Sequence, residues 1–234
     1  MRWNRDDRSL SIAIFVLACV PFFVSQFTFG LFLEADPDEA ESLLKDIFLD
    51  FKGHLVAAGI LNHHLSFRLT YLAFKWWGIG DWRDAMVHLE VARLVPISLF
   101  FITFALLYRL AVRYFTWEAG VVAAVILAST PLIMNQAPQI RSYSGSLMLM
   151  TLLIHTFLSH CEQPRLLKAV LIALWSGLSI YSLIFNAYFI LSLGLLTLVL
   201  HGLRDRSTGG VMSWIDHFFQ AWKPWRWDDT WLAG

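Results

Sequence analysis

The sequence predicts an all-α, polytopic membrane protein with about six transmembrane helices and amphipathic helices beside the membrane. Hydrophobic residues make up 57% of the 234 residues and charged residues make up 15%, whereas a soluble domain carries about 25% charged residues. Long windows contain no charged side chain, and segments between them have the 3.6-residue periodicity of an amphipathic helix. With a mean hydropathy of +0.57, the chain would expose too much apolar surface in water.

Four charge-free windows account for the first four predicted spans. A bilayer core of about 30 Å needs about 20 helical residues. Arg93 and Arg109 flank the shorter second window, and their long side chains extend it to a span of roughly 19 residues by reaching toward water. Pro131 lies near the exit of the third window. The four windows are residues 9–33, 94–108, 119–140 and 142–161.

The last uncharged run, residues 169–203, is too long for one crossing. As a single helix, its 35 residues would extend about 52 Å, well beyond the thickness of the hydrocarbon core. We therefore expect two short spans joined by a turn near Ser182 to Asn186.

Basic residues in the short loops orient these spans. With six spans, nearly all of these residues lie on one side, which the positive-inside rule makes the cytoplasmic side. Both termini then face the cytoplasm, and the long loop of residues 34–92 faces outward. The chain divides into a transmembrane domain, residues 1–203, and a cytoplasmic tail, residues 204–234. The cytoplasmic basic residues are Arg2, Arg5, Arg8, Arg109, Arg113, Arg165, Lys168, Arg204 and Arg206.

Four segments are expected to lie on the membrane surface. Residues 38–52 place an apolar stripe opposite charged side chains, which is typical of an interfacial helix. Residues 64–78 and 82–92 are predicted to form two further helices of the outward loop. The tail, residues 204–234, is rich in tryptophan, which prefers the headgroup region. The stripe in 38–52 comprises Ala40, Leu43, Leu44, Ile47, Phe48 and Phe51.

The outward loop begins with the acidic sequence EADPDEAE, which has two interpretations. Asp36 suits a helix N-cap, Pro37 suits the first helical position, and Glu39 completes a capping box. Capping leaves Asp38 without a structural role. At a boundary between water and membrane, this carboxylate could serve as a general base or as a ligand for a hard metal ion.

A second polar cluster, QIRSY, follows the third window. Arg141 and Tyr143 suit an ordinary interfacial anchor, and they also suit phosphate capture. The forked guanidinium matches phosphate oxygens, and the tyrosine can donate another hydrogen bond. If the first loop folds over this end, Asp38 and Arg141 would face each other at one membrane surface, as transfer from a lipid-phosphate donor requires.

Other classes of site find little support in the sequence. His63 and His64 are adjacent and point to different helix faces, so their spacing is poor for a metal site. Cys19 and Cys161 lie in separate apolar runs and form no paired motif. Basic and acidic residues both total 18, so no positive field favours a nucleic acid partner.

Several short motifs follow one another in a recognisable order. DPDE comes after the first span, HHL begins an interfacial segment that ends in WG, RLVP opens the second span, and RSY opens the fourth. In this order the chain resembles the amino-terminal membrane half of a GT-C glycosyltransferase. The types concerned are the protein O-mannosyltransferases and the lipid A aminoarabinose transferases. The resemblance covers about residues 10–200.

This resemblance implies a reaction, a site and a location. The donor would be a polyprenyl-phosphate sugar, and an acceptor hydroxyl or amine would attack its anomeric carbon with inversion. Some members use a divalent metal and others none, so the cofactor is left open. The protein would lie in a bacterial inner membrane. The catalytic pair would be Asp38 and Glu39, and the substrate-binding residues would be Arg141, Tyr143, His63 and His64.

Two functions are therefore expected from the sequence. The first is glycosyl transfer at the outer membrane face, with the lipid bilayer and a lipid-linked sugar as partners. The alternative is a non-catalytic subunit of a larger membrane complex, derived from a GT-C scaffold and bound to partner subunits. Relatives are longer and add further spans, so this chain is expected to correspond to their amino-terminal half or to a short relative.

Overall fold

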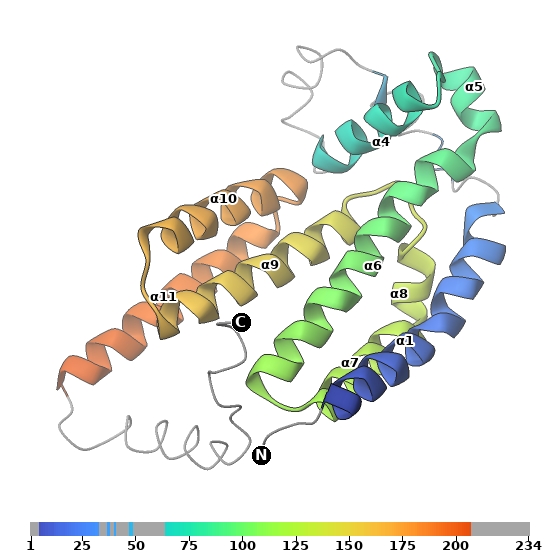
Figure 1. Ribbon diagram of the computed structural model, residues 1–234. Helices are drawn as coiled ribbons and strands as arrows, with labels where there is room; N and C mark the ends of the chain where they lie inside the picture. The colour runs from blue at the N-terminus through green and yellow to red at the C-terminus, as the bar shows by residue number, and fades with distance from the viewer. Residues whose placement is uncertain (1–4, 33–36, 38–39, 41–46, 49–63, 207–234) are drawn as a thin grey trace.

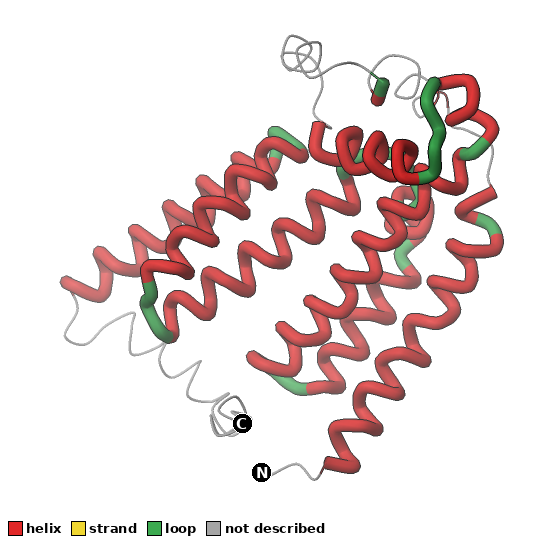
Figure 2. The backbone as a smooth tube through the Cα atoms, turned by 45° about the horizontal axis from the view of Figure 1, so that its top comes forward, coloured by secondary structure: helices red, strands yellow, loops and turns green. Residues whose placement is uncertain are grey.

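A computed structural model describes residues 5–32, 37, 40, 47–48 and 64–206. In this part of the chain the regular elements are helices, as predicted (Figures 1 and 2). They are α1 (Arg5–Thr28), the 3-10 helix η1 (Gly30–Phe32), α4 (His64–Trp76), α5 (Trp82–Val87), α6 (Leu89–Tyr114), α7 (Trp117–Ser129), α8 (Pro131–Gln136), α9 (Tyr143–Glu162), α10 (Leu166–Ser182) and α11 (Asn186–Arg206).

Among the described residues, three helices are long and apolar enough to cross a membrane. They are Ser9–Phe32, Leu89–Tyr114 and Tyr143–Glu162, which match the first, second and fourth predicted spans. The protein is thus an integral membrane protein. Shorter apolar helices lie at Trp117–Ser129, Leu166–Ser182 and Asn186–Thr197. The six-span topology stays a prediction, because length and composition support three crossings directly.

The third charge-free window, residues 119–140, holds two helices, and the first ends beside Pro131, where the sequence places the exit of the span. Helix α7 ends at Ser129, Thr130 is extended with φ −73° and ψ 117°, and Pro131 begins α8. Proline has no N–H to donate and disfavours helical conformation in the residue before it, so the helix stops and restarts there.

The predicted division of residues 169–203 is confirmed. Helix α10 ends at Ser182 and α11 begins at Asn186, so the turn lies where the sequence placed it. Leu183 is extended, with φ −151° and ψ 113°, and its amide donates to the carbonyl oxygen of Ser179.

The long helices pack side by side. Helix α6 contacts α7 and α9, α9 contacts α10, and α1 contacts α7. Phe22 of α1 lies 5.2 Å from Phe104 of α6 between ring centroids, within an apolar core that both helices share. Gly120 of α7 allows a close approach to α6, since a Cβ there would lie 2.9 Å from the Tyr108 ring.

Helices α4 and α5 lie across one end of the bundle, where α1 ends, α6 and α9 begin, and α10 meets α11 (Figures 1 and 2). We call this end the α4 end. Helix α4 contacts both α6 and α10 there. An amphipathic helix that covers the ends of spanning helices is the arrangement expected for residues 64–78.

The other predicted surface helices have mixed outcomes. The single helix expected over residues 82–92 is wrong: α5 ends at Val87, His88 has non-helical φ −117° and ψ 46°, and α6 begins at Leu89. For residues 38–52 the structure describes positions 40, 47 and 48, and the tail after residue 206 lies outside the described residues.

Candidate functional site

Helix α4 is fixed over the bundle by its apolar face. Phe67 and Phe74 are almost fully buried, whereas Leu72 and Trp76 on the other side are 60% and 87% exposed. This division matches the amphipathic pattern of the sequence. Among the polar residues of the buried face, Ser66 donates a hydrogen bond from Oγ to the carbonyl oxygen of Arg141, at 2.9 Å.

That hydrogen bond ties α4 to the loop that carries Arg141 and Tyr143. Guanidinium Nη1 of Arg141 donates to the hydroxyl of Tyr143 at 3.5 Å, and both side chains are half-buried. The backbone bends sharply here, with the amide of Arg141 donating to the carbonyl of Gln139 at 2.7 Å. The structure therefore brings the two predicted phosphate-binding residues together at the α4 end.

Arg93 is a buried cation at the same end, so the expectation that its side chain reaches toward water is wrong. The side chain is 2% exposed, and Nη1 donates to the carbonyl oxygens of Gly30 at 3.2 Å and Leu31 at 3.3 Å. A cation suits a helix C-terminus, where carbonyl groups lack helical partners. Arg93 of α6 thus fixes the point where the chain leaves α1.

The apolar stripe predicted in residues 38–52 is fixed to α4 where the structure describes it. Ile47 is fully buried in the core that includes Phe74, and the Phe48 ring stacks on Phe74 with centroids 5.8 Å apart. The Phe48 ring also meets Tyr71 edge to face. Together with Arg93, these contacts anchor the chain on both sides of the acidic sequence.

The predicted catalytic carboxylates, Asp38 and Glu39, lie outside the described residues, as does His63. His64 is the first residue of α4. Their predicted roles are therefore expectations about a segment whose two flanks are held at the α4 end.

Polar side chains also lie close together where α9 begins, α10 ends and α11 begins. The side-chain nitrogen Nδ2 of Asn186 donates hydrogen bonds to the hydroxyls of Ser146 at 2.7 Å and Ser179 at 2.8 Å. The sequence assigned Asn186 to the turn, but its side chain also links three helices. Ser144 and Ser182 are fully buried, and their hydroxyls have no hydrogen-bond partner among the described residues.

The chemistry that the sequence predicts at the α4 end is anion recognition. Arg141 and Tyr143 carry donors of the kind that suits a phosphate. No set of three or more histidine, cysteine or acidic side chains that could hold a metal gathers among the described residues. The sequence signal for this end was the single arginine in a short loop, whereas the serines carried no distinguishing pattern.

Comparison with known proteins gives one family. Residues 85–217 match the model of the dolichyl-phosphate-mannose-protein mannosyltransferases. The matched segment includes Arg93, Arg141 and Tyr143, and it begins after the acidic sequence and the histidine pair. No match was found among curated proteins or among solved structures.

Proposed function

The chain belongs to the dolichyl-phosphate-mannose-protein mannosyltransferase family, within the GT-C glycosyltransferases, and on that basis we propose that it transfers a sugar from a polyprenyl-phosphate donor. The acceptor is a hydroxyl or amine at the membrane face where α4 lies. Mannose is the first sugar to test, because the family description names it.

One observation carries this proposal: the anchoring of four separate segments at the α4 end. Arg93 holds the end of α1, Phe48 packs on α4, and Ser66 of α4 binds the loop of Arg141. A membrane transferase needs its acceptor-side carboxylate and its phosphate-binding group on one membrane face. The two anchored flanks favour such a position for the acidic sequence.

In the proposed reaction, Asp38 takes the proton of the acceptor, with Glu39 beside it. The acceptor oxygen or nitrogen then bonds to the anomeric carbon, whose bond to the phosphate oxygen breaks with inversion. Arg141 and Tyr143 stabilise the polyprenyl phosphate that leaves with the bonding electrons. His63 and His64 are assigned to the substrate. Whether a divalent metal assists is left open.

The test is sugar transfer from polyprenyl-phosphate mannose, with the purified chain and with native membranes. Asp38→Asn removes the charge and nearly keeps the shape, so activity should fall by about 10²–10⁴-fold while the melting temperature stays unchanged. Asp84→Asn, an exposed carboxylate of α5, is the matched control and should retain full activity.

A second substitution tests the phosphate-binding role. Arg141→Lys keeps the charge and loses the fork, so activity should fall, whereas Arg83→Lys on the exposed side of α5 should not change it. Full activity in Asp38→Asn would contradict the proposed base. Absence of transfer in both unmutated preparations would favour the alternative of a non-catalytic subunit.

A further inference from the structure

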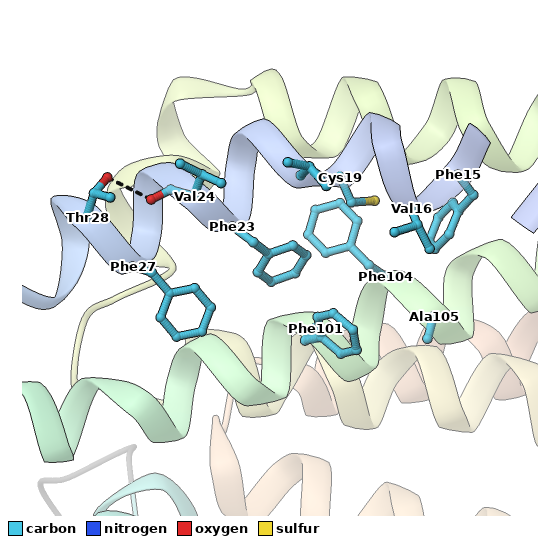
Figure 3. Close-up of a pocket in the computed structure, with 11 residues that line it drawn as sticks. Phe15, Val16, Cys19, Phe23, Val24, Phe27, Thr28, Phe101, Phe104 and Ala105 are labelled. Atoms are coloured by element: carbon cyan, nitrogen blue, oxygen red, sulfur yellow. Dashed lines mark hydrogen bonds between the residues drawn. The ribbon is translucent and has the colours of Figure 1, made fainter. Parts of the chain in front are cut away.

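Helices α1 and α6 line a groove of about 370 Å³ at the surface of the bundle (Figure 3). Its floor is buried, with Cys19 5% and Phe104 1% exposed, whereas Val24 and Phe101 on its rims are 53% and 60% exposed. Ala105 leaves room between the larger side chains that line the groove. The groove is therefore open at the surface of the bundle.

The lining is hydrocarbon almost throughout. Thr28 has a hydroxyl, which donates to the carbonyl oxygen of Val24 inside α1 at 2.7 Å (Figure 3). A groove that offers water so few partners is poorly hydrated. It extends from Phe15 to Thr28, about 20 Å along the helix. The hydrocarbon core of a bilayer is about 30 Å thick, so the groove is somewhat longer than the thickness of one leaflet. One acyl chain of a membrane lipid matches this length and chemistry.

The groove becomes polar at its Phe15 end. The Tyr108 ring lies 4.2 Å from the Phe15 ring between centroids, and the Tyr108 hydroxyl donates to Ser11 Oγ at 2.9 Å. Arg109 is the next residue of α6 and lies four positions, or about one turn, beyond Ala105. Its side chain is exposed, and its charge also acts on His155 of α9.

We propose that the α1–α6 groove binds one acyl chain of an anionic phospholipid, whose phosphate is held by Arg109. The charge of Arg109 at the groove's polar end gives the complementarity, because a guanidinium binds phosphate oxygens through its fork. The lipid would fix α1 against α6 without taking part in sugar transfer.

The position of Arg109 separates this lipid from the proposed sugar donor. Arg93 and Arg109 lie 16 residues apart on α6, or about 24 Å along the helix axis. Arg93 is at the α4 end with Arg141, whereas α6 runs from there to the other end of the bundle (Figure 1), so a phosphate bound by Arg109 lies far from the α4 end. The inference therefore does not depend on the proposed transfer reaction.

Native mass spectrometry of the full chain tests the proposal, with phosphatidylglycerol and phosphatidylcholine of identical acyl chains as probes. The unmutated protein should retain one phosphatidylglycerol about fivefold more tightly than phosphatidylcholine, the effect expected of one basic residue at an anionic lipid. Arg109→Gln should remove this preference. Arg165→Gln, another exposed arginine, is the control and should keep it.

Filling the groove tests the chain-binding part. Ala105→Trp should abolish the retained lipid, and Val20→Trp, on the other wall, gives a second variant if the first fails to fold. Ala123→Trp, at an exposed alanine of α7, should leave retention unchanged. Retention in both groove variants, or an unchanged preference in Arg109→Gln, would overturn the proposal. Displacement of phosphatidylglycerol by polyprenyl phosphate, absent in Ala105→Trp, would instead assign the groove to the donor.

Discussion

Two polar side chains shape the α4 end by binding backbone or hydroxyl groups of other helices. Arg93 binds carbonyl groups of η1, directly after α1, and Asn186 joins α11 to the Ser146 and Ser179 hydroxyls. Buried donors of this kind stabilise one packing arrangement, because moving either helix would leave a polar group without a partner. Both residues therefore have a structural role that a catalytic interpretation of this end must take into account.

Replacing Arg93 should destabilise the protein. We expect Arg93→Gln to lower the free energy of unfolding by about 2 kcal/mol, because hydrogen bonds from a charged donor contribute about 1.5–3 kcal/mol. Thermal or denaturant unfolding in detergent measures the change. Arg83→Gln, an exposed arginine, is the control and should change the stability by no more than about 0.5 kcal/mol. Equal stability of both variants would show that the Gly30 and Leu31 contacts contribute little.

At the scale of elements, helix ends decide where the predicted segments break. Windows without charge located the helices, but they did not reveal the break at His88 or the short helix α8 that follows Pro131. Asp81 explains where α5 begins, because its carboxylate accepts from the amides of Arg83 and Asp84. A hydropathy window averages side-chain polarity and therefore does not detect such local hydrogen bonds to the backbone.

The end of α4 is fixed by a glycine with positive φ. Gly78 has φ +78°, its amide donates to the Lys75 carbonyl, and the Ile79 amide donates to the Phe74 carbonyl. Ile79 and Phe74 belong to the same buried cluster, so the turn also directs the chain back onto the core. The sequence predicts this end, because the amphipathic segment 64–78 ends at Gly78.

Replacing this glycine should strain the backbone without a steric clash. A Cβ at Gly78 would meet nothing within 4 Å, so the expected loss of about 1–2 kcal/mol in Gly78→Ala comes from the left-handed conformation. The melting temperature in detergent measures it. Gly80→Ala is the matched control, since that site is equally open and has no positive φ. Equal melting temperatures would contradict the proposed helix end.

At the scale of the whole molecule, the helices collect residues from distant parts of the sequence at one end. Gly30, Ser66, Arg93 and Arg141 come from four separate segments, and hydrogen bonds connect them in pairs. The proposed transfer function and the proposed lipid site then fall at opposite ends of α6.

The topology can be tested by cysteine labelling in intact cells. In a chain with Cys161→Ser, a membrane-impermeant reagent applied from outside should label Asp50→Cys but not Arg206→Cys. Labelling of both should follow membrane permeabilisation, which serves as the control. Outside labelling at position 206 would mean that α10 and α11 together cross the membrane once or that the orientation is reversed.

The sequence by itself determined the fold class, the positions of the main helices and the turn before Asn186. These follow from local properties: charge excluded from hydrocarbon, helical periodicity, and a run too long for one crossing. It also indicated that Arg141 and Tyr143 belong together, since they are two residues apart. The roles of Asp38, Glu39, His63 and His64 stay predictions.

Only the tertiary structure decided which distant segments meet. The burial of Arg93, the bond from Ser66 to the Arg141 loop and the helix link through Asn186 depend on contacts between residues 40 to 75 positions apart. The α1–α6 groove likewise depends on how two antiparallel helices align Phe15 with Tyr108. Such contacts arise from packing and hydrogen-bond satisfaction between whole elements, and neither leaves a periodic signal in a single segment of the chain.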